Sequence, residues 1–180
     1  MSSMVNQLQM NPTDIPFKYR VDKYEQLSEF LLSNSQLNGE KIQFLFALTG
    51  IEDGEKIPLD TKDSSPKEHT LSRVTYNRNI VSMERDFGLI TIIDSLNEPY
   101  NEVLNNKAFL KNSDEGVRYL SLPNVSTFYE YLLGGIDPLY DIVMGYGTED
   151  TQIFDALYDY LMSDKNIEFM DNIAKEIANE

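Results

Sequence analysis

Apolar residues recur every three or four positions along most of this chain, which is the spacing of one buried helix face. The stretch from Leu89 to Leu96 is almost entirely apolar and is therefore predicted to lie in the core. Glycine-containing turns, among them Gly134-Gly135, separate the periodic stretches. The pattern predicts a mainly α protein, a compact domain of about six to eight helices with short connections, in which the clearest helices are 123–133, 136–144, 148–161 and 164–177.

The residues before the first predicted helix follow a different period. From Ile15 to Val21 apolar and basic side chains alternate, which is typical of a short exposed strand or extended arm. This arm is the one clear strand candidate in the sequence. Asp22 then stands where a helix N-cap is expected, and Glu25 three residues later completes a pattern similar to a capping box.

Three later segments carry weaker local signals. Residues 41–51 are dense in apolar side chains, and periodicity alone does not separate helix from strand there. Residues 52–66 concentrate turn formers and are predicted to be a mobile surface loop. Ser65 followed by Pro66 is typical of a helix start, so we expect a helix from this point through residue 87.

Composition limits the classes of protein and of chemistry. A chain of 180 residues with 41% hydrophobic and 25% charged residues should form one domain, here residues 15–180 after a flexible 1–14. It has no cysteine and one histidine, His69, so disulfides, thiolate nucleophiles and sulfur-ligated zinc are excluded, and no metal or cofactor is expected. No apolar run is long enough for a membrane span, and Met1 to Pro12 lacks the pattern of a signal peptide, so we expect a cytoplasmic protein.

Charge is distributed unevenly between the two halves. Residues 1–90 hold 10 basic and 13 acidic residues, whereas residues 91–180 hold 5 basic and 17 acidic ones. This field repels phosphate, so direct nucleic-acid binding is not expected. The acidic half could be a solvated surface or could bind a basic or amphipathic-helical protein, and self-association is also possible. Because tyrosine combines apolar area with a polar tip, we select acids and tyrosines as candidate partner-binding residues: Glu130, Tyr131, Asp137, Tyr140, Asp141, Asp155, Tyr158 and Asp159.

The motifs that would indicate catalysis are weak. Gly145-Tyr146-Gly147 is not followed by the lysine of a phosphate-binding loop, and the acids of residues 53–63 lack calcium-loop spacing. Asp155 and Asp159 lie four residues apart on a predicted helix, where acid and base roles are conceivable, but nothing selects this pair. We therefore expect no enzymatic activity and nominate no catalytic residue.

Two regions resemble a known family. Residues 15–20, followed closely by 23–27, look like the opening of the tail assembly chaperones of Gram-positive phages and prophages, where an extended arm leads into an acidic helix. Residues 79–100, which include Ser95-Leu96-Asn97-Glu98-Pro99, and residues 132–144 are similar to two later helices of that family. The helices after Gly147 are additional to the pattern. The resemblance implies a small, helical, non-enzymatic protein that binds the tape-measure protein and prevents its hydrophobic helices from aggregating before tail assembly.

Two other functions are compatible with the charge. An acidic inhibitor of the anti-restriction or anti-CRISPR type would use carboxylates to imitate a phosphate backbone. An enzyme with a carboxylate pair and magnesium would require three or more acids around one cavity, and the sequence offers no such triplet. We therefore keep protein binding as the main hypothesis and the nucleic-acid mimic as the alternative.

Overall fold

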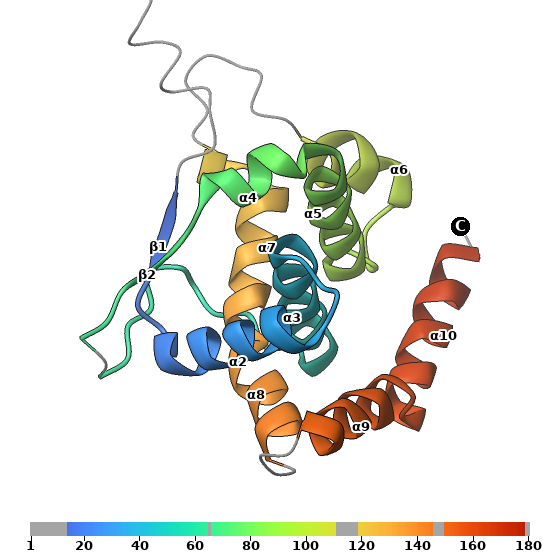
Figure 1. Ribbon diagram of the computed structural model, residues 1–180. Helices are drawn as coiled ribbons and strands as arrows, with labels where there is room; N and C mark the ends of the chain where they lie inside the picture. The colour runs from blue at the N-terminus through green and yellow to red at the C-terminus, as the bar shows by residue number, and fades with distance from the viewer. Residues whose placement is uncertain (1–13, 65, 111–118, 146–149, 179–180) are drawn as a thin grey trace, which may run out of the picture.

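The computed structural model describes residues 14–64, 66–110, 119–145 and 150–178, and its fold is mainly α, as predicted (Figure 1). Helices pack around a central α7, and a two-stranded sheet lies at one side. In the described residues, no helix is long and apolar enough to cross a membrane. In chain order the elements are β1 (Ile15–Phe17), α2 (Val21–Asn34), α3 (Gly39–Asp53), β2 (His69–Leu71), α4 (Arg73–Arg78), α5 (Ile80–Asp94), α6 (Tyr100–Val103), the π-helix η1 (Leu104–Ala108), the 3-10 helix η2 (Tyr119–Ser121), α7 (Pro123–Gly134), α8 (Ile136–Met144), α9 (Asp150–Leu161) and α10 (Asp164–Ala178).

Helices α3 and α7 approach each other very closely in the core. A Cβ at Gly50 would lie 2.0 Å from the backbone oxygen of Tyr131, and one at Gly135 would lie 1.8 Å from that of Phe46. Neither oxygen can move freely because both belong to helical backbone. The crossing therefore requires glycine on both sides. Aromatic rings fill the space around it, and those of Phe17, Phe46, Phe87 and Phe128 are among the largest fully buried side chains.

The predicted N-terminal strand is confirmed as β1, but α2 does not begin as predicted. Its N-cap is Arg20 in the left-handed conformation (φ 51°), with no side-chain capping hydrogen bond. Asp22 lies inside the first turn, and its carboxylate is bonded to the ammonium group of Lys67. The capping-box prediction is wrong because a contact 45 residues away in sequence, rather than the local backbone, engages this carboxylate.

The prediction of a helix from residue 65 to residue 87 is also wrong in its first part. Residues His69–Leu71 form β2, which pairs antiparallel with β1 so that Leu71 lies opposite Ile15. Helix α4 begins after Ser72, whose hydroxyl accepts a hydrogen bond from the backbone N–H of Val74 at 3.1 Å. The strand forms here because β1 offers unpaired backbone groups, which outweigh the weak helix signal at Pro66.

The dense apolar segment 41–51 is helical and belongs to α3. The Asn38 side chain accepts from the backbone N–H of Lys41, and Gly54 ends the helix with φ 72°. The segment that follows is irregular, as expected, but it is attached to the body: Ile57 N–H donates to the backbone oxygen of Glu130 at 3.1 Å. Asp63 N–H donates to the backbone oxygen of Lys18 at 3.3 Å. The mobility of 52–66 stays a prediction.

The remaining helix predictions agree closely with the structure. Helices α7, α8 and α10 begin at Pro123, Ile136 and Asp164. In the apolar run 89–96, Ile90 and Ile92 are buried, whereas Leu89 is 39% exposed. Residues 1–13 of the segment predicted to be flexible, 1–14, and the first residues of the predicted helix 148–161 lie outside the described residues. Asp14 is described, and its carboxylate accepts a hydrogen bond from the backbone N–H of Arg73 at 2.8 Å.

Replacing Gly50 with alanine should destabilise the protein strongly. The added methyl group would overlap the α7 backbone, so we expect the free energy of unfolding to fall by about 3 kcal/mol or more. Gly39→Ala is the control, because a Cβ there would meet Thr75 only at 3.8 Å, and the change should stay within about 1 kcal/mol. Urea denaturation of both variants measures this difference, and equal stability would contradict the assigned packing.

Candidate functional site

The eight candidate partner-binding residues fall into two groups. Five of them lie on α7 and α8 and contact the N-terminal part of the chain: Glu130, Tyr131, Asp137, Tyr140 and Asp141. The other three are exposed on α9: Asp155, Tyr158 and Asp159. The structure thus gives five of the candidates partners inside the molecule, although the side chain of Asp141 is itself 71% exposed, and leaves the three on α9 open to solvent.

The α8 candidates attach this helix to the start of α2. Asp137 accepts from Arg20 Nε at 2.8 Å and lies 2.6 Å from Lys23 Nζ. Lys23 also pairs with Asp141 at 3.2 Å and lies over the ring of Tyr140, 4.9 Å from its centroid. Partial burial alone would raise the pKa of Asp137, but Lys23 and Arg20 outweigh it and hold the pKa below its ordinary value. These acids stabilise the fold.

The α7 candidates attach the irregular segment after α3. The Tyr131 hydroxyl donates to Asp94 Oδ1 at 2.6 Å, and this tyrosine is buried. Lys56 lies 3.2 Å from Asp94 and 4.0 Å from Glu130, and its Nζ is 5.3 Å from the centroid of the Tyr131 ring. Burial raises the pKa of the Glu130 carboxyl, and the nearby Lys56 opposes that rise. This second group of polar contacts is also internal.

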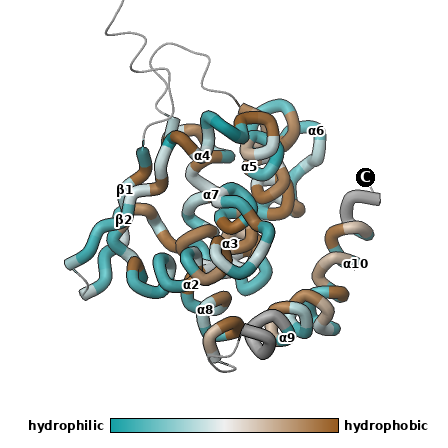
Figure 2. Tube along the Cα trace, in the orientation of Figure 1, coloured by the Kyte–Doolittle hydropathy of each residue, from teal (hydrophilic) through white to brown (hydrophobic). Residues whose placement is uncertain are grey.

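A different surface is left open on α9 and α10. We define the α9–α10 surface as the exposed apolar side chains of these helices together with the exposed acids among them. Figure 2 shows both hydrophobic and hydrophilic positions along the coloured parts of the two helices. Tyr158 and Met170 are 64% and 61% exposed, although large apolar side chains are usually buried. The apolar members are Tyr158, Leu161, Met162, Ile167 and Met170, and the acidic members are Asp155, Asp159, Asp164, Glu168 and Asp171.

Both helices are held to the end of α3 by one buried carboxylate. Glu52, whose side chain is 4% exposed, accepts from the Tyr160 hydroxyl at 2.9 Å and pairs with Lys165 at 2.6 Å. Lys165 also bonds to Asp53 at 2.8 Å, and these two carboxylates raise its pKa. Because Lys165 is engaged with α3, it does little to neutralise the acids of the α9–α10 surface. No local sequence pattern indicates this role of Glu52, because its partners Tyr160 and Lys165 lie more than 100 residues away.

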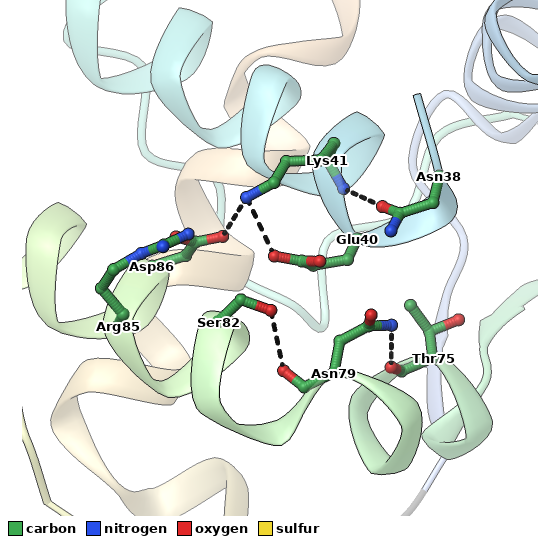
Figure 3. A network of polar contacts seen from close by, with 8 residues as sticks. All are labelled: Asn38, Glu40, Lys41, Thr75, Asn79, Ser82, Arg85 and Asp86. Atoms are coloured by element: carbon green, nitrogen blue, oxygen red, sulfur yellow. Dashed lines mark hydrogen bonds and ion pairs between the residues drawn. The ribbon is translucent and has the colours of Figure 1, made fainter. Parts of the chain in front are cut away.

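A further polar cluster, which the sequence pattern did not indicate, is buried between α3 and α5 (Figure 3). Glu40 and Asp86 are 3% and 1% exposed, and Lys41 Nζ lies 3.1 Å from Glu40 Oε1 and 3.7 Å from Asp86 Oδ2. Arg85 donates to Asp86 Oδ1 from two nitrogens, at 2.7 and 3.0 Å. Asp86 lies on the same helix face as the buried residues Met83 and Ile90, which is the sequence signal that could have placed it inside.

The pKa values of the two buried carboxyls are shifted in opposite directions. Burial raises the pKa of Asp86 despite Arg85 and Lys41, whereas the pKa of Glu40 is lowered because its bonds to Ser82 and Lys41 outweigh burial. Such divergent pairs can act as acid and base, but Arg85 and Lys41 pair with this one inside the core, and Asp86 Oδ2 has no hydrogen-bond partner there among the described residues. The neighbouring cavities are lined by Arg85 and by Gly39, not by either carboxyl. Within the described parts of the chain, no three acids or histidines gather as a metal site would require. The pair therefore fits a structural role.

Asp137→Asn should destabilise the protein by about 1 kcal/mol at neutral pH, because it removes a partly buried ion pair with Arg20 and Lys23. Folding lowers the pKa of Asp137. Its contribution to the free energy of unfolding is therefore fully present at pH values above the pKa of the unfolded state, and it is lost as the pH falls through the lower pKa of the folded state. Asp155→Asn, at an exposed position, is the control and should change little. Thermal unfolding of both variants from pH 7 to acid tests this, and a pH-independent loss in Asp137→Asn would contradict the ion-pair assignment.

No protein-family model, curated protein or solved structure matches this chain. Its function must therefore be inferred from its own surfaces. The carboxylates of Asp86, Glu52 and Asp137 are paired with basic side chains within the molecule. The α9–α10 surface is the candidate site whose residues remain open to a partner.

Proposed function

We propose that this chain is a non-enzymatic protein-binding protein, whose α9–α10 surface binds a basic amphipathic helix of another protein. The observation that carries the proposal is the combination of exposed large apolar side chains with exposed acids on two adjacent helices. An amphipathic helix would cover the apolar side chains while its basic residues meet the acids.

The apolar part of this surface suits a helical partner. Leu161 ends α9, Met162 follows it in the connection, and Ile167 and Met170 lie on the first turns of α10, so the four follow one another in sequence. All are at least 46% exposed. Methionine is unbranched and polarisable and adapts to varied apolar partners, which favours binding to helices that differ in sequence. Burying these side chains would supply most of the binding free energy.

The acidic part supplies orientation and attraction. Asp155 and Asp159 lie one turn apart on α9, and Asp164, Glu168 and Asp171 follow the same spacing on α10. Two lysines oppose these acids: Lys165 is bonded to Glu52 and Asp53, and Lys175 is exposed in the last turn of α10. A basic helix would be attracted to this surface, whereas an acidic one would be repelled.

In its more specific form, the proposal is that the protein is a tail assembly chaperone of a phage or mobile element that acts in the cytoplasm and binds the tape-measure protein. The segments that resemble that family form β1 and the start of α2, then α5, α6, the end of α7 and α8. These elements build the body, and the additional helices α9 and α10 would supply the binding surface. The resemblance implies a tape-measure protein with long hydrophobic helices, whose apolar side chains would pack against the exposed apolar side chains of this surface.

The nucleic-acid mimic receives less support from the geometry. A mimic of the phosphate backbone would present rows of free carboxylates, yet Asp137 and Asp141 face Arg20 and Lys23. On the α9–α10 surface, Met170 and other exposed apolar side chains interrupt the acids. A surface of this mixed kind favours a protein helix.

Ile167→Ser with Met170→Ser should weaken binding of a synthetic amphipathic helix that carries leucines on one face and lysines on the other. Loss of two buried apolar contacts should lower affinity about tenfold or more, as measured by fluorescence anisotropy. Leu32→Ser is the matched control, because Leu32 is 54% exposed on α2, outside the α9–α10 surface. Equal affinity for the wild type and the double variant would contradict the proposal.

Two further measurements separate charge from shape. Asp155→Asn with Asp159→Asn should weaken binding several-fold at low salt, and the difference should shrink at about 0.5 M salt as screening increases. A scrambled peptide of the same composition should bind more weakly, because it cannot form one apolar face.

The tail assembly chaperone hypothesis has its own test. Co-expression of this chain with tape-measure segments should increase the solubility of those segments, and failure to recover any complex would contradict the hypothesis.

A further inference from the structure

A second exposed apolar surface lies at the other side of the molecule, on α4 and the first half of α5. We define the α4–α5 surface as the exposed side chains Arg73, Val74, Arg78, Ile80, Val81 and Arg85, with Phe109 beside them. Val81 is 84% exposed, and Val74, Ile80 and Phe109 are each more than 40% exposed. Exposed patches of this kind typically mark an interaction surface.

Part of this surface is a groove of about 330 Å³. Val81, Glu84 and Arg85 form one wall, and Phe109, Leu110 and Asn124 form the other. The groove depends on Gly88, since a Cβ there would lie 2.2 Å from Phe109 Cε1. Without a side chain at residue 88, the Phe109 ring can lie directly against α5. Val81, Phe109 and Leu110 therefore give the groove an apolar part suited to aliphatic or methionine side chains, beside the polar Glu84, Arg85 and Asn124.

The charge of the α4–α5 surface is opposite to that of the protein as a whole. The chain carries a net charge of -15, yet the exposed charged side chains that define this surface are three arginines. Two acids lie beside them: the half-buried Glu84 in the groove wall, and Asp14, whose carboxylate accepts a hydrogen bond from the backbone N–H of Arg73 at 2.8 Å. Among the described residues, Arg73 and Arg78 form no side-chain ion pair. Arg85 pairs with buried Asp86, but its side chain remains 53% exposed. This surface should attract an acidic partner.

We propose that the partner of the α4–α5 surface is the α9–α10 surface of a second copy of this chain. The α4–α5 surface is apolar and basic, and the α9–α10 surface is apolar and acidic, so the charges of the two surfaces are complementary. Met170 and Ile167 of one copy would enter the groove beside Val81 of the next. Carboxylates such as Asp159 would meet Arg73 and Arg78 at its edge.

The positions of the two surfaces determine the kind of assembly. Figure 1 shows α4 and the α9–α10 pair on opposite sides of α3 and α7, so one copy does not bring its own two surfaces together. Contacts between copies are then head to tail, and each added copy leaves one surface of each kind unoccupied unless a ring closes. This inference uses the surface named in the proposed function but not its partner, and a basic helix would compete with self-association.

Sedimentation of the full-length chain tests this inference. The weight-average mass should rise with protein concentration, and the rise should weaken at about 0.5 M salt because charge attraction is screened. Arg78→Glu with Val81→Glu alters only the α4–α5 surface, and Asp159→Lys with Met170→Lys alters only the α9–α10 surface. Each variant alone should remain a monomer. All four residues are exposed, so circular dichroism and the unfolding temperature should stay close to those of the wild type.

Mixing the two variants gives the decisive result. Each retains the surface that the other has lost, so an equimolar mixture should form dimers with one intact contact. Lys62→Glu with Leu32→Glu makes matched changes at exposed positions outside both surfaces, and it should assemble like the wild type. A wild type that stays monomeric, a mixture that stays monomeric, or assembly of the Arg78→Glu, Val81→Glu variant alone would each overturn the inference.

The same variants separate this inference from the proposed function. The Arg78→Glu, Val81→Glu variant should bind the synthetic basic helix as tightly as the wild type does, because its α9–α10 surface is unchanged. Loss of self-association with unchanged peptide binding would leave the proposed function standing. Self-association without peptide binding would contradict the proposed function and would support only the contact between copies.

Discussion

The close crossing of α3 and α7 is the constraint on which the rest of this fold depends. Backbone meets backbone at Gly50 and Gly135, so the distance between these helices is set by atoms that cannot be exchanged. Gly134 is under the same restriction, because a Cβ there would lie 1.7 Å from the backbone oxygen of Glu55. The crossing thus fixes the end of α7, the start of α8 and the first residues after α3 relative to one another. Both polar attachments, at Lys56 and at Asp137, occur beside this junction.

The acidic composition has different consequences in different parts of the molecule. Basic residues of the N-terminal half meet acids of the C-terminal half across α2 and α8, so much of the charge near the core is balanced locally. The balance ends at α9 and α10, where exposed acids surround exposed apolar side chains. A net charge computed for half the sequence does not reveal this difference, because it depends on which carboxylates the fold brings next to lysine and arginine.

Helix positions were predictable where the signal was local. Proline at residue 123 and the glycines at 134–135 mark the start and the end of α7 in the sequence and in the structure, because proline and glycine act on the conformation of the neighbouring backbone. The strand β2 was not predictable, because its formation depends on the unpaired groups of β1 more than 50 residues earlier. The buried carboxyl of Glu40 was hidden for the same reason. Of the candidate site, the exposed α9 residues could be selected from helical spacing, but the internal pairing of Asp137 could not.

The long separation of the attachment points has a consequence for synthesis on the ribosome. Arg20 and Asp137 are 117 residues apart, and the contacts of α10 with the end of α3 span 112. The strand β1 and the helix α2 therefore emerge from the ribosome long before α8 has been synthesised. Until α8 emerges, β1 and α2 lack the ion pairs that attach them to it. The domain can close fully only after α10 has emerged from the ribosome and reached the end of α3.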